Sequence, residues 1–143
     1  MGFLFSAIAG ALMSVQGVTN TRLSEKIGLY ESNMFVQGTA FVLSLLAMWF
    51  LGKGDLRQLS QAPWYSYLGG LFGLGITIFV MLGIGNLSPA LATMTILIAQ
   101  MVLSALIEGF GWLGTEAAGF QWRQFLAVGL MLGGIILFQW KKG

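Results

Sequence analysis

The sequence predicts an all-α, polytopic membrane protein with five transmembrane helices. Of its 143 residues, 57% are hydrophobic and only 8% are charged. Soluble domains carry about a quarter charged residues, so this composition cannot cover a water-facing surface. The charged residues are also grouped, and the uncharged intervals between the groups have the length of membrane spans.

The first two spans are marked by intervals without charge. A helix that crosses about 30 Å of hydrocarbon needs about 20 apolar residues. No charged side chain occurs in 1–21 or in 32–52, which predicts helices near 3–22 and 32–51. The N-terminal segment has no positively charged region before its apolar stretch. We therefore expect the first helix to be retained rather than removed as a signal peptide.

The next uncharged interval, 58–107, has fifty residues, which is too long for one helix and right for two. We expect the break at 85–89, Gly-Asn-Leu-Ser-Pro. Gly and Asn favour a turn there, and Pro suits the first turn of a new helix. The interval therefore predicts helices near 64–85 and 89–110.

The last uncharged interval predicts a fifth helix near 122–140. Indole side chains prefer the headgroup level of a membrane. Every tryptophan lies within a few residues of an expected helix end, at Trp49, Trp64, Trp112, Trp122 and Trp140. Five helices place the two termini on opposite sides of the membrane.

The loop charges are nearly balanced between the two sides. Orientation normally follows an excess of Lys and Arg on the cytoplasmic side. The N-terminal side is expected to hold three of these residues and the other side four, namely Lys53, Arg57 and Arg123 against Arg22, Lys26, Lys141 and Lys142. Either the Lys141-Lys142 end fixes a single topology, or copies insert both ways and pair as an antiparallel dimer of ten helices.

The residue types that are missing exclude several functions. The chain has no His and no Cys, so thiolate and imidazole chemistry, a zinc-finger site and a disulfide framework are ruled out. We therefore expect no enzymatic activity, no metal site and no cofactor. Seven Lys and Arg against five Asp and Glu leave no basic patch large enough to predict nucleic-acid binding. The expected partners are the lipid bilayer, a second chain and a small-molecule substrate.

The expected spans contain polar side chains at helical spacing, and polar groups in hydrocarbon must find partners. They form three stripes: Gln16 and Asn20; Asn33 and Gln37; and Thr93, Gln100, Ser104 and Glu108. One interpretation is structural, since interhelical hydrogen bonds of about 1 kcal/mol are common in membrane bundles. The other is a substrate site or pore lined by Gln16, Asn20, Gln37, Gln100, Ser104 and Glu108.

Glu108 is the only carboxylate within an expected span, and it lies near the end of that span. It either sits at the interface, pairing with Arg123 or with water, or has a role in transport. In an antiparallel dimer, Glu108 of one copy would approach the depth of Asn20 and Gln37 in the second copy. A polar cavity shared between two copies is then expected.

Small residues at four-residue spacing predict close helix packing. Such ridges occur on three of the expected helices, at Ser6, Gly10 and Ser14, at Gly69 and Gly73, and at Gly129 and Gly133.

Four motifs, taken together and in order, resemble a known family. They are Gln16-x-x-x-Asn20-x-x-Leu23; Ala62-Pro63-Trp64 leading into Leu68-Gly69-Gly70-Leu71-x-Gly73; Gln100 followed by Glu108-Gly109-Phe110-Gly111; and Arg123 before Gly129 and Gly133-Gly134. The sequence is similar along its whole length to the YdcZ family of small five-helix bacterial inner-membrane proteins. That family is a branch of the drug/metabolite transporter superfamily.

The resemblance implies a multi-pass protein of the bacterial inner membrane that forms half of a transporter. Members occur as dual-topology single proteins, as opposed pairs or as fused ten-helix chains. We therefore expect a small-metabolite secondary transporter that works by alternating access as an antiparallel homodimer, or as a heterodimer with an opposite-topology paralogue. The alternatives are a passive channel and a non-transporting scaffold or subunit.

The first helix departs from the small multidrug-resistance relatives, which carry a glutamate at its middle. Here, the corresponding region has Gly10, Ser14 and Gln16 and no acid. This difference argues against proton-coupled export of cationic drugs.

Overall fold

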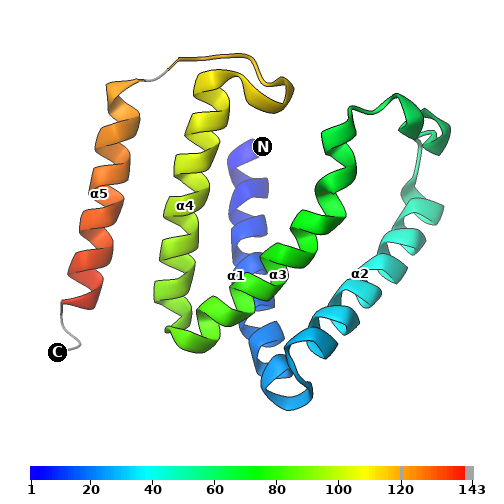
Figure 1. Ribbon diagram of the computed structural model, residues 1–143, viewed down its shortest axis with the longest axis horizontal. Helices are drawn as coiled ribbons and strands as arrows, with labels where there is room; N and C mark the ends of the chain where they lie inside the picture. The colour runs from blue at the N-terminus through cyan, green and yellow to red at the C-terminus, as the bar shows by residue number, and fades with distance from the viewer. Residues whose placement is uncertain (120, 141–143) are drawn as a thin grey trace. The chain divides into compact units, whose positions relative to one another are not determined.

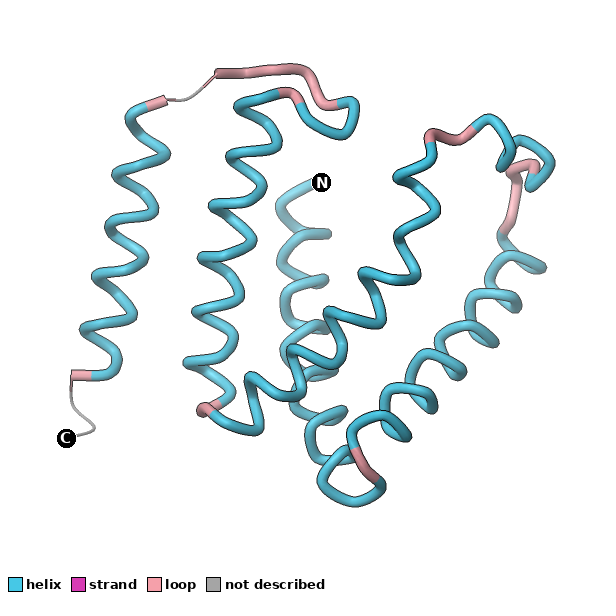
Figure 2. Tube along the Cα trace, in the orientation of Figure 1, coloured by secondary structure: helices cyan, strands magenta, loops and turns pink. Residues whose placement is uncertain are grey.

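The computed structural model describes residues 1–119 and 121–140 (Figure 1). These residues form helices and loops and no strand, as Figure 2 shows. The five long helices are α1 (Gly2–Ile27), α2 (Leu29–Leu51), α3 (Gly69–Asn86), α4 (Pro89–Phe110) and α5 (Trp122–Gln139). Five segments are long and apolar enough to cross a membrane, the third being α3 together with the short helix before it. The chain divides into two compact units, 1–86 and 87–143.

Helices α1 and α2 are longer than the sequence predicted, and a single residue, Gly28, separates them. The expected first helix ended at residue 22, but α1 continues through the charged segment to Ile27. Arg22 pairs with Glu25 at 3.1 Å across one turn, and Lys26 lies in the last turn, where a cation suits the helix dipole. The charged residues therefore end the apolar span without ending the helix.

Gly28 makes this tight connection possible. Its φ of 102° and ψ of 156° belong to a region that is nearly restricted to glycine. A Cβ at this position would collide with the carboxylate of Glu31. The backbone of Gly28 still serves both helices, because its N–H donates to Ser24 O and its carbonyl accepts from Ser32 N.

The third span begins as a tighter helix than predicted. After the loop that follows α2, two 3-10 helices, η1 (Leu56–Gln61) and η2 (Trp64–Leu68), lead directly into α3. Asp55 caps η1, since its side chain accepts a hydrogen bond from Arg57 N at 2.9 Å. The span near 64–85 is thus a 3-10 turn followed by an α-helix, and short 3-10 segments are common at helix ends.

Helices α1, α2 and α3 contact one another in pairs and form the first unit. Helices α1 and α3 are in tight contact at Gly17, where a Cβ would lie 2.8 Å from Ile84 Cδ1 and 3.1 Å from Val80 Cγ1. Ile84 and Met81 of α3 are buried beside this contact. A glycine without side chain thus lets α1 approach α3 closely, as small residues do in membrane bundles.

Helices α4 and α5 form a hairpin in the second unit. Ser88 begins α4 by accepting from Leu91 N, and Pro89 occupies the first turn, as the predicted break at 85–89 requires. The loop after α4 satisfies the last carbonyls of that helix: Ala118 N donates to Glu108 O, and Thr115 Oγ1 donates to Ile107 O. Gly111, with φ of 68°, ends α4 in the left-handed conformation.

All five tryptophans lie exposed at helix ends, within three residues of a boundary. This placement suits indoles at the two membrane interfaces. Lys141 and Lys142, which the sequence assigns to one side, lie outside the described residues.

The close approach at Gly17 predicts a sharp difference between two glycines of α1. Gly17→Leu is expected to destabilise the protein by about 1–3 kcal/mol, because the new side chain must displace Ile84 and Val80. Gly10→Leu, on the same helix with nothing within 4 Å of its Cβ position, is the matched control and is expected to cost less than about 0.5 kcal/mol. Thermal unfolding in detergent measures both. Equal destabilisation by the two variants would contradict this packing.

Candidate functional site

A small cavity lies between α1 and α3 in the first unit. It is lined by Met13, Gln16, Gly17 and Asn20 of α1 and by Ile76, Thr77 and Val80 of α3. Its volume of about 40 Å³ suffices for a few water molecules. The structure thus brings Gln16 and Asn20, predicted to share one face of the first helix, to the wall of a single cavity.

The cavity lies near the middle of the spans. Thr77 is nine residues before the end of α3 at Asn86, which corresponds to about 14 Å along the helix. Gln16 is similarly central in α1, which runs from Gly2 to Ile27. The cavity wall is mostly apolar, and Gln16, Asn20 and Thr77 supply its polar groups at this depth.

Gln37 of α2 reaches the same cavity through Thr77. Its Nε2 donates to Thr77 Oγ1 at 3.3 Å, and Thr77 Oγ1 donates to Gly73 O at 2.8 Å. A Cβ on Gly73 would lie 3.8 Å from Gln37 Nε2, so Gly73 leaves room for the amide. Gln37 and Gly73, both predicted from the sequence, therefore both bond to Thr77, which was not predicted as a site residue.

A second polar contact joins α2 to both α1 and α3. Ser32 of α2 has no exposed surface, and its hydroxyl lies 3.3 Å from Asn20 O and 3.7 Å from Met81 Sδ. This one side chain therefore touches both α1 and α3. Ser32 was not among the residues predicted from the sequence, although it directly precedes the predicted stripe of Asn33 and Gln37.

Asn33 is the most unusual side chain of the unit. Only 5% of its surface is exposed, and its Oδ1 has no hydrogen-bond partner among the described residues. A buried acceptor without a partner costs about 1–3 kcal/mol. Hydroxyl groups in the spans avoid this cost by bonding to their own helix, as Thr39 does to Phe35 O.

The polar cluster of the first unit, which we define as Gln16, Asn20, Ser32, Asn33, Gln37 and Thr77, contains no charged side chain. The carboxylates of this unit are exposed and lie at helix ends or loops, at Glu25, Glu31 and Asp55. No group of three acidic residues that could hold a metal ion occurs in the described chain. The cluster can therefore offer amide and hydroxyl hydrogen bonds and no counter-charge.

The remaining predicted site residues lie on α4. Gln100, Ser104 and Glu108 are exposed on the α4–α5 hairpin taken by itself, and among the described ion pairs none joins Glu108 to Arg123. The backbone carbonyl of Glu108 accepts from Ala118 N, which fixes the loop and leaves the carboxylate free. The α4 stripe thus has no partner helix within its own unit.

The predicted packing glycines are mostly open within their units. A Cβ at Gly10, Gly69, Gly129 or Gly133 would meet nothing within 4 Å, and Ser14 bonds only to Gly10 O of its own helix. Gly73 approaches Gln37, as described above. The buried glycine of α1 is Gly17, which lies three residues after Ser14 and outside the predicted ridge.

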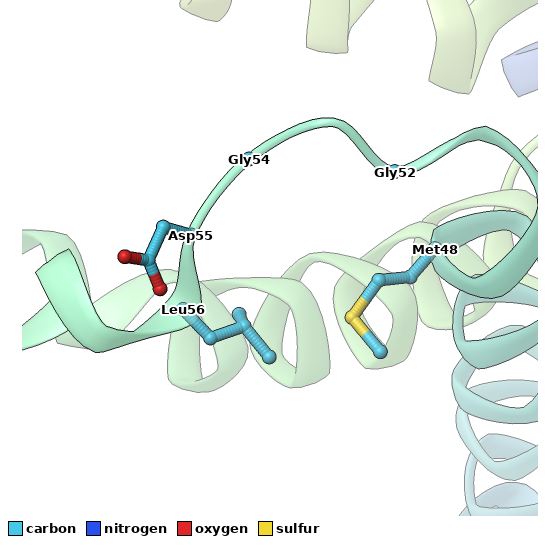
Figure 3. Close-up of a pocket in the computed structure, with 5 residues that line it drawn as sticks. All are labelled: Met48, Gly52, Gly54, Asp55 and Leu56. Atoms are coloured by element: carbon cyan, nitrogen blue, oxygen red, sulfur yellow. The ribbon is translucent and has the colours of Figure 1, made fainter.

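A larger hollow lies in the loop after α2 and has a different character. Met48, Gly52, Gly54, Asp55 and Leu56 surround about 450 Å³. Figure 3 shows the side chains of Met48 and Leu56 pointing toward each other, while the carboxylate of Asp55 points away from them. The lining residues are all exposed, so this hollow is an open surface at the end of a span rather than an enclosed site.

The comparison with protein families agrees with this arrangement. A family model described as "Putative inner membrane exporter, YdcZ" matches residues 1–137. The chain belongs to the YdcZ family. The match covers the first four apolar helices and all but the last two residues of the fifth. This member of a family described as inner-membrane exporters has five candidate membrane spans in its described residues. No curated protein and no solved structure matches the chain.

The contact between Gln37 and Thr77 predicts measurable coupling between α2 and α3. A double-mutant cycle of Gln37→Leu and Thr77→Val is expected to give a coupling energy of about 0.5–1 kcal/mol, the range of interhelical hydrogen bonds in membranes. Pairing Gln37→Leu with Thr39→Val is the matched control, because the Thr39 hydroxyl bonds to its own helix. Unfolding in SDS measures both cycles. Additive effects in the first cycle would contradict the contact.

Proposed function

We propose that this YdcZ-family protein is a secondary transporter that moves a small metabolite by alternating access, as an antiparallel, dual-topology homodimer. The observation that carries the proposal is the uncharged cavity near the middle of α1 and α3, whose mostly apolar wall carries the polar groups of Gln16, Asn20 and Thr77. The family description adds a direction, export across the inner membrane. Gln16, Asn20 and Gln37 bind the substrate through amide hydrogen bonds.

The contacts around the cavity suit a protein that changes conformation. A single hydrogen bond from Gln37 to Thr77 joins α2 to α3 beside the cavity. Such a bond is worth about 1 kcal/mol in a membrane protein. A contact of this strength can break and reform during a transport cycle, whose motions take microseconds to milliseconds.

A second copy would complete the polar surfaces that one chain leaves open. The α4 stripe of Gln100, Ser104 and Glu108 is exposed on its hairpin, and polar groups in hydrocarbon need partners. In an antiparallel pair, this stripe faces the interior of the dimer and Glu108 serves as the ion- or proton-linked group. The nearly balanced loop charges allow the two insertions that such a pair needs. An oppositely oriented paralogue could take the place of one copy.

Alternating access predicts that Thr77 becomes accessible to water from each side of the membrane. The chain has no cysteine, so a single Thr77→Cys gives no background labelling. In sealed proteoliposomes, a membrane-impermeant maleimide added outside is expected to label nearly all copies, because each copy opens to the outside in its cycle. Phe79→Cys, at an exposed position of α3, is the control and is expected to stay unlabelled in lipid. Thr77→Cys that remains as unreactive as Phe79→Cys would exclude a conducting pathway here.

The dimer model predicts two orientations for one sequence. Single cysteines replacing Tyr30, in the first turn of α2, and Gly54, which follows the end of α2, report the two sides without changing the loop charges, and both positions are exposed. In intact cells, each variant is expected to be labelled in about half of its copies, since topology follows the Lys and Arg balance of the loops. Labelling of one variant alone would show a single orientation and would require an oppositely oriented partner chain.

A further inference from the structure

The buried acceptor of Asn33 is the one feature of the polar cluster that the fold itself does not explain. Its side chain is enclosed, and Oδ1 lacks a donor among the described residues. Buried polar groups in native proteins are nearly always paired, and exceptions concentrate at functional sites. The missing donor therefore points to a group that is not part of the three-helix unit.

Asn33 lies between two residues of α2 that contact the lining of the cavity. One residue earlier, Ser32 touches Asn20, which lines the cavity from α1. One turn later, Gln37 bonds to Thr77, which lines the cavity from α3. Residues four apart lie on the same helix face, so Asn33 and Gln37 face the same side of α2. Asn33 is thus held between the two contacts that join α2 to the cavity walls.

We propose that Asn33 is a substrate-binding residue whose Oδ1 accepts a hydrogen bond from an uncharged N–H or O–H donor of the transported solute, so that the site selects neutral, hydrogen-bonding molecules. This inference rests on the transporter function proposed above and names the substrate class of the same site.

The charge distribution favours a neutral solute over a cation. A buried cation needs a counter-charge, because its desolvation is not otherwise offset. The carboxylates of the first unit are exposed at helix ends or loops: Glu25 pairs with Arg22, Glu31 lies beside Gly28 at the turn, and Asp55 caps η1. The lysines and arginines of this unit are also exposed, so an anion finds no buried partner there either. Amide and hydroxyl groups are what the cluster offers.

The first test is Asn33→Leu, an apolar residue of similar size. An unpaired buried acceptor lowers the stability of the protein, and leucine removes that cost. The thermal unfolding midpoint of the full chain is therefore expected to stay equal or to rise by a few degrees. Asn86→Leu is the matched control, because the Asn86 amide is exposed and bonded to Leu82 O. A midpoint that falls further for Asn33→Leu than for Asn86→Leu would show that Asn33 holds the fold together, and would overturn the proposal.

The second test measures binding with small probes. Acetamide, which is neutral and carries N–H donors, is expected to raise the unfolding midpoint of the wild type and of Asn86→Leu by a few degrees near saturation. Its donor-free analogue N,N-dimethylacetamide and the cation methylammonium are expected to give no such rise. The acetamide effect is expected to be lost in Asn33→Leu and also in Asn33→Ala, which removes the amide without adding bulk.

The proposal is overturned if acetamide has no effect on the wild type or if its effect persists in both Asn33 variants. It is also overturned by an equal effect of the donor-free analogue or by a larger effect of methylammonium. These results are separate from the labelling of Thr77→Cys. An Asn33-dependent effect with unreactive Thr77→Cys would leave a binding site without transport, whereas reactive Thr77→Cys without that effect would leave a transporter with another specificity.

Discussion

The hydrogen-bonding contact of Ser32 with Asn20 O is the interaction on which the three-helix unit depends. Ser32 is completely buried, and it also touches Met81, so one hydroxyl joins α1, α2 and α3. The single-residue connection at Gly28 places Ser32 four residues into the hairpin, opposite the last turns of α1. Near this contact, Ile84 and Val80 of α3 also pack against α1 at Gly17.

This arrangement explains why the polar cavity lies where it does. Close packing at Gly17 and the contact of Ser32 fix the helices on one side of the cavity, while the weak bond from Gln37 to Thr77 joins them on the other. Polar side chains with single hydrogen bonds replace the apolar core that a soluble bundle would have. In lipid, apolar side chains supply no driving force between helices, so small and polar residues decide where helices meet.

The two units divide the chemistry of the chain between them. The first unit holds an uncharged polar cluster. The second unit carries Glu108, the one acidic residue of the predicted polar stripes, on the surface of its hairpin. For an inner-membrane exporter family, this separation suits substrate recognition by neutral groups and coupling by an acid. An antiparallel pair would bring both kinds of group to one interior, which is the physical basis of the proposed mechanism.

The sequence by itself determined the number of helices, because rare charges measure the spans directly, and it identified Gln16 and Asn20 as one face from their spacing. It misjudged the ends of α1 and α2, since Arg22, Glu25 and Lys26 end the apolar span while the helix continues to Ile27. The tertiary structure alone decided that Ser32 and Thr77 belong to the polar cluster, and that Asn33, predicted only as part of a stripe, is buried with an unpaired Oδ1 among the described residues. Helical periodicity shows which residues share a face, but which faces meet depends on packing at Gly17 and on the turn at Gly28, contacts between residues far apart in the chain.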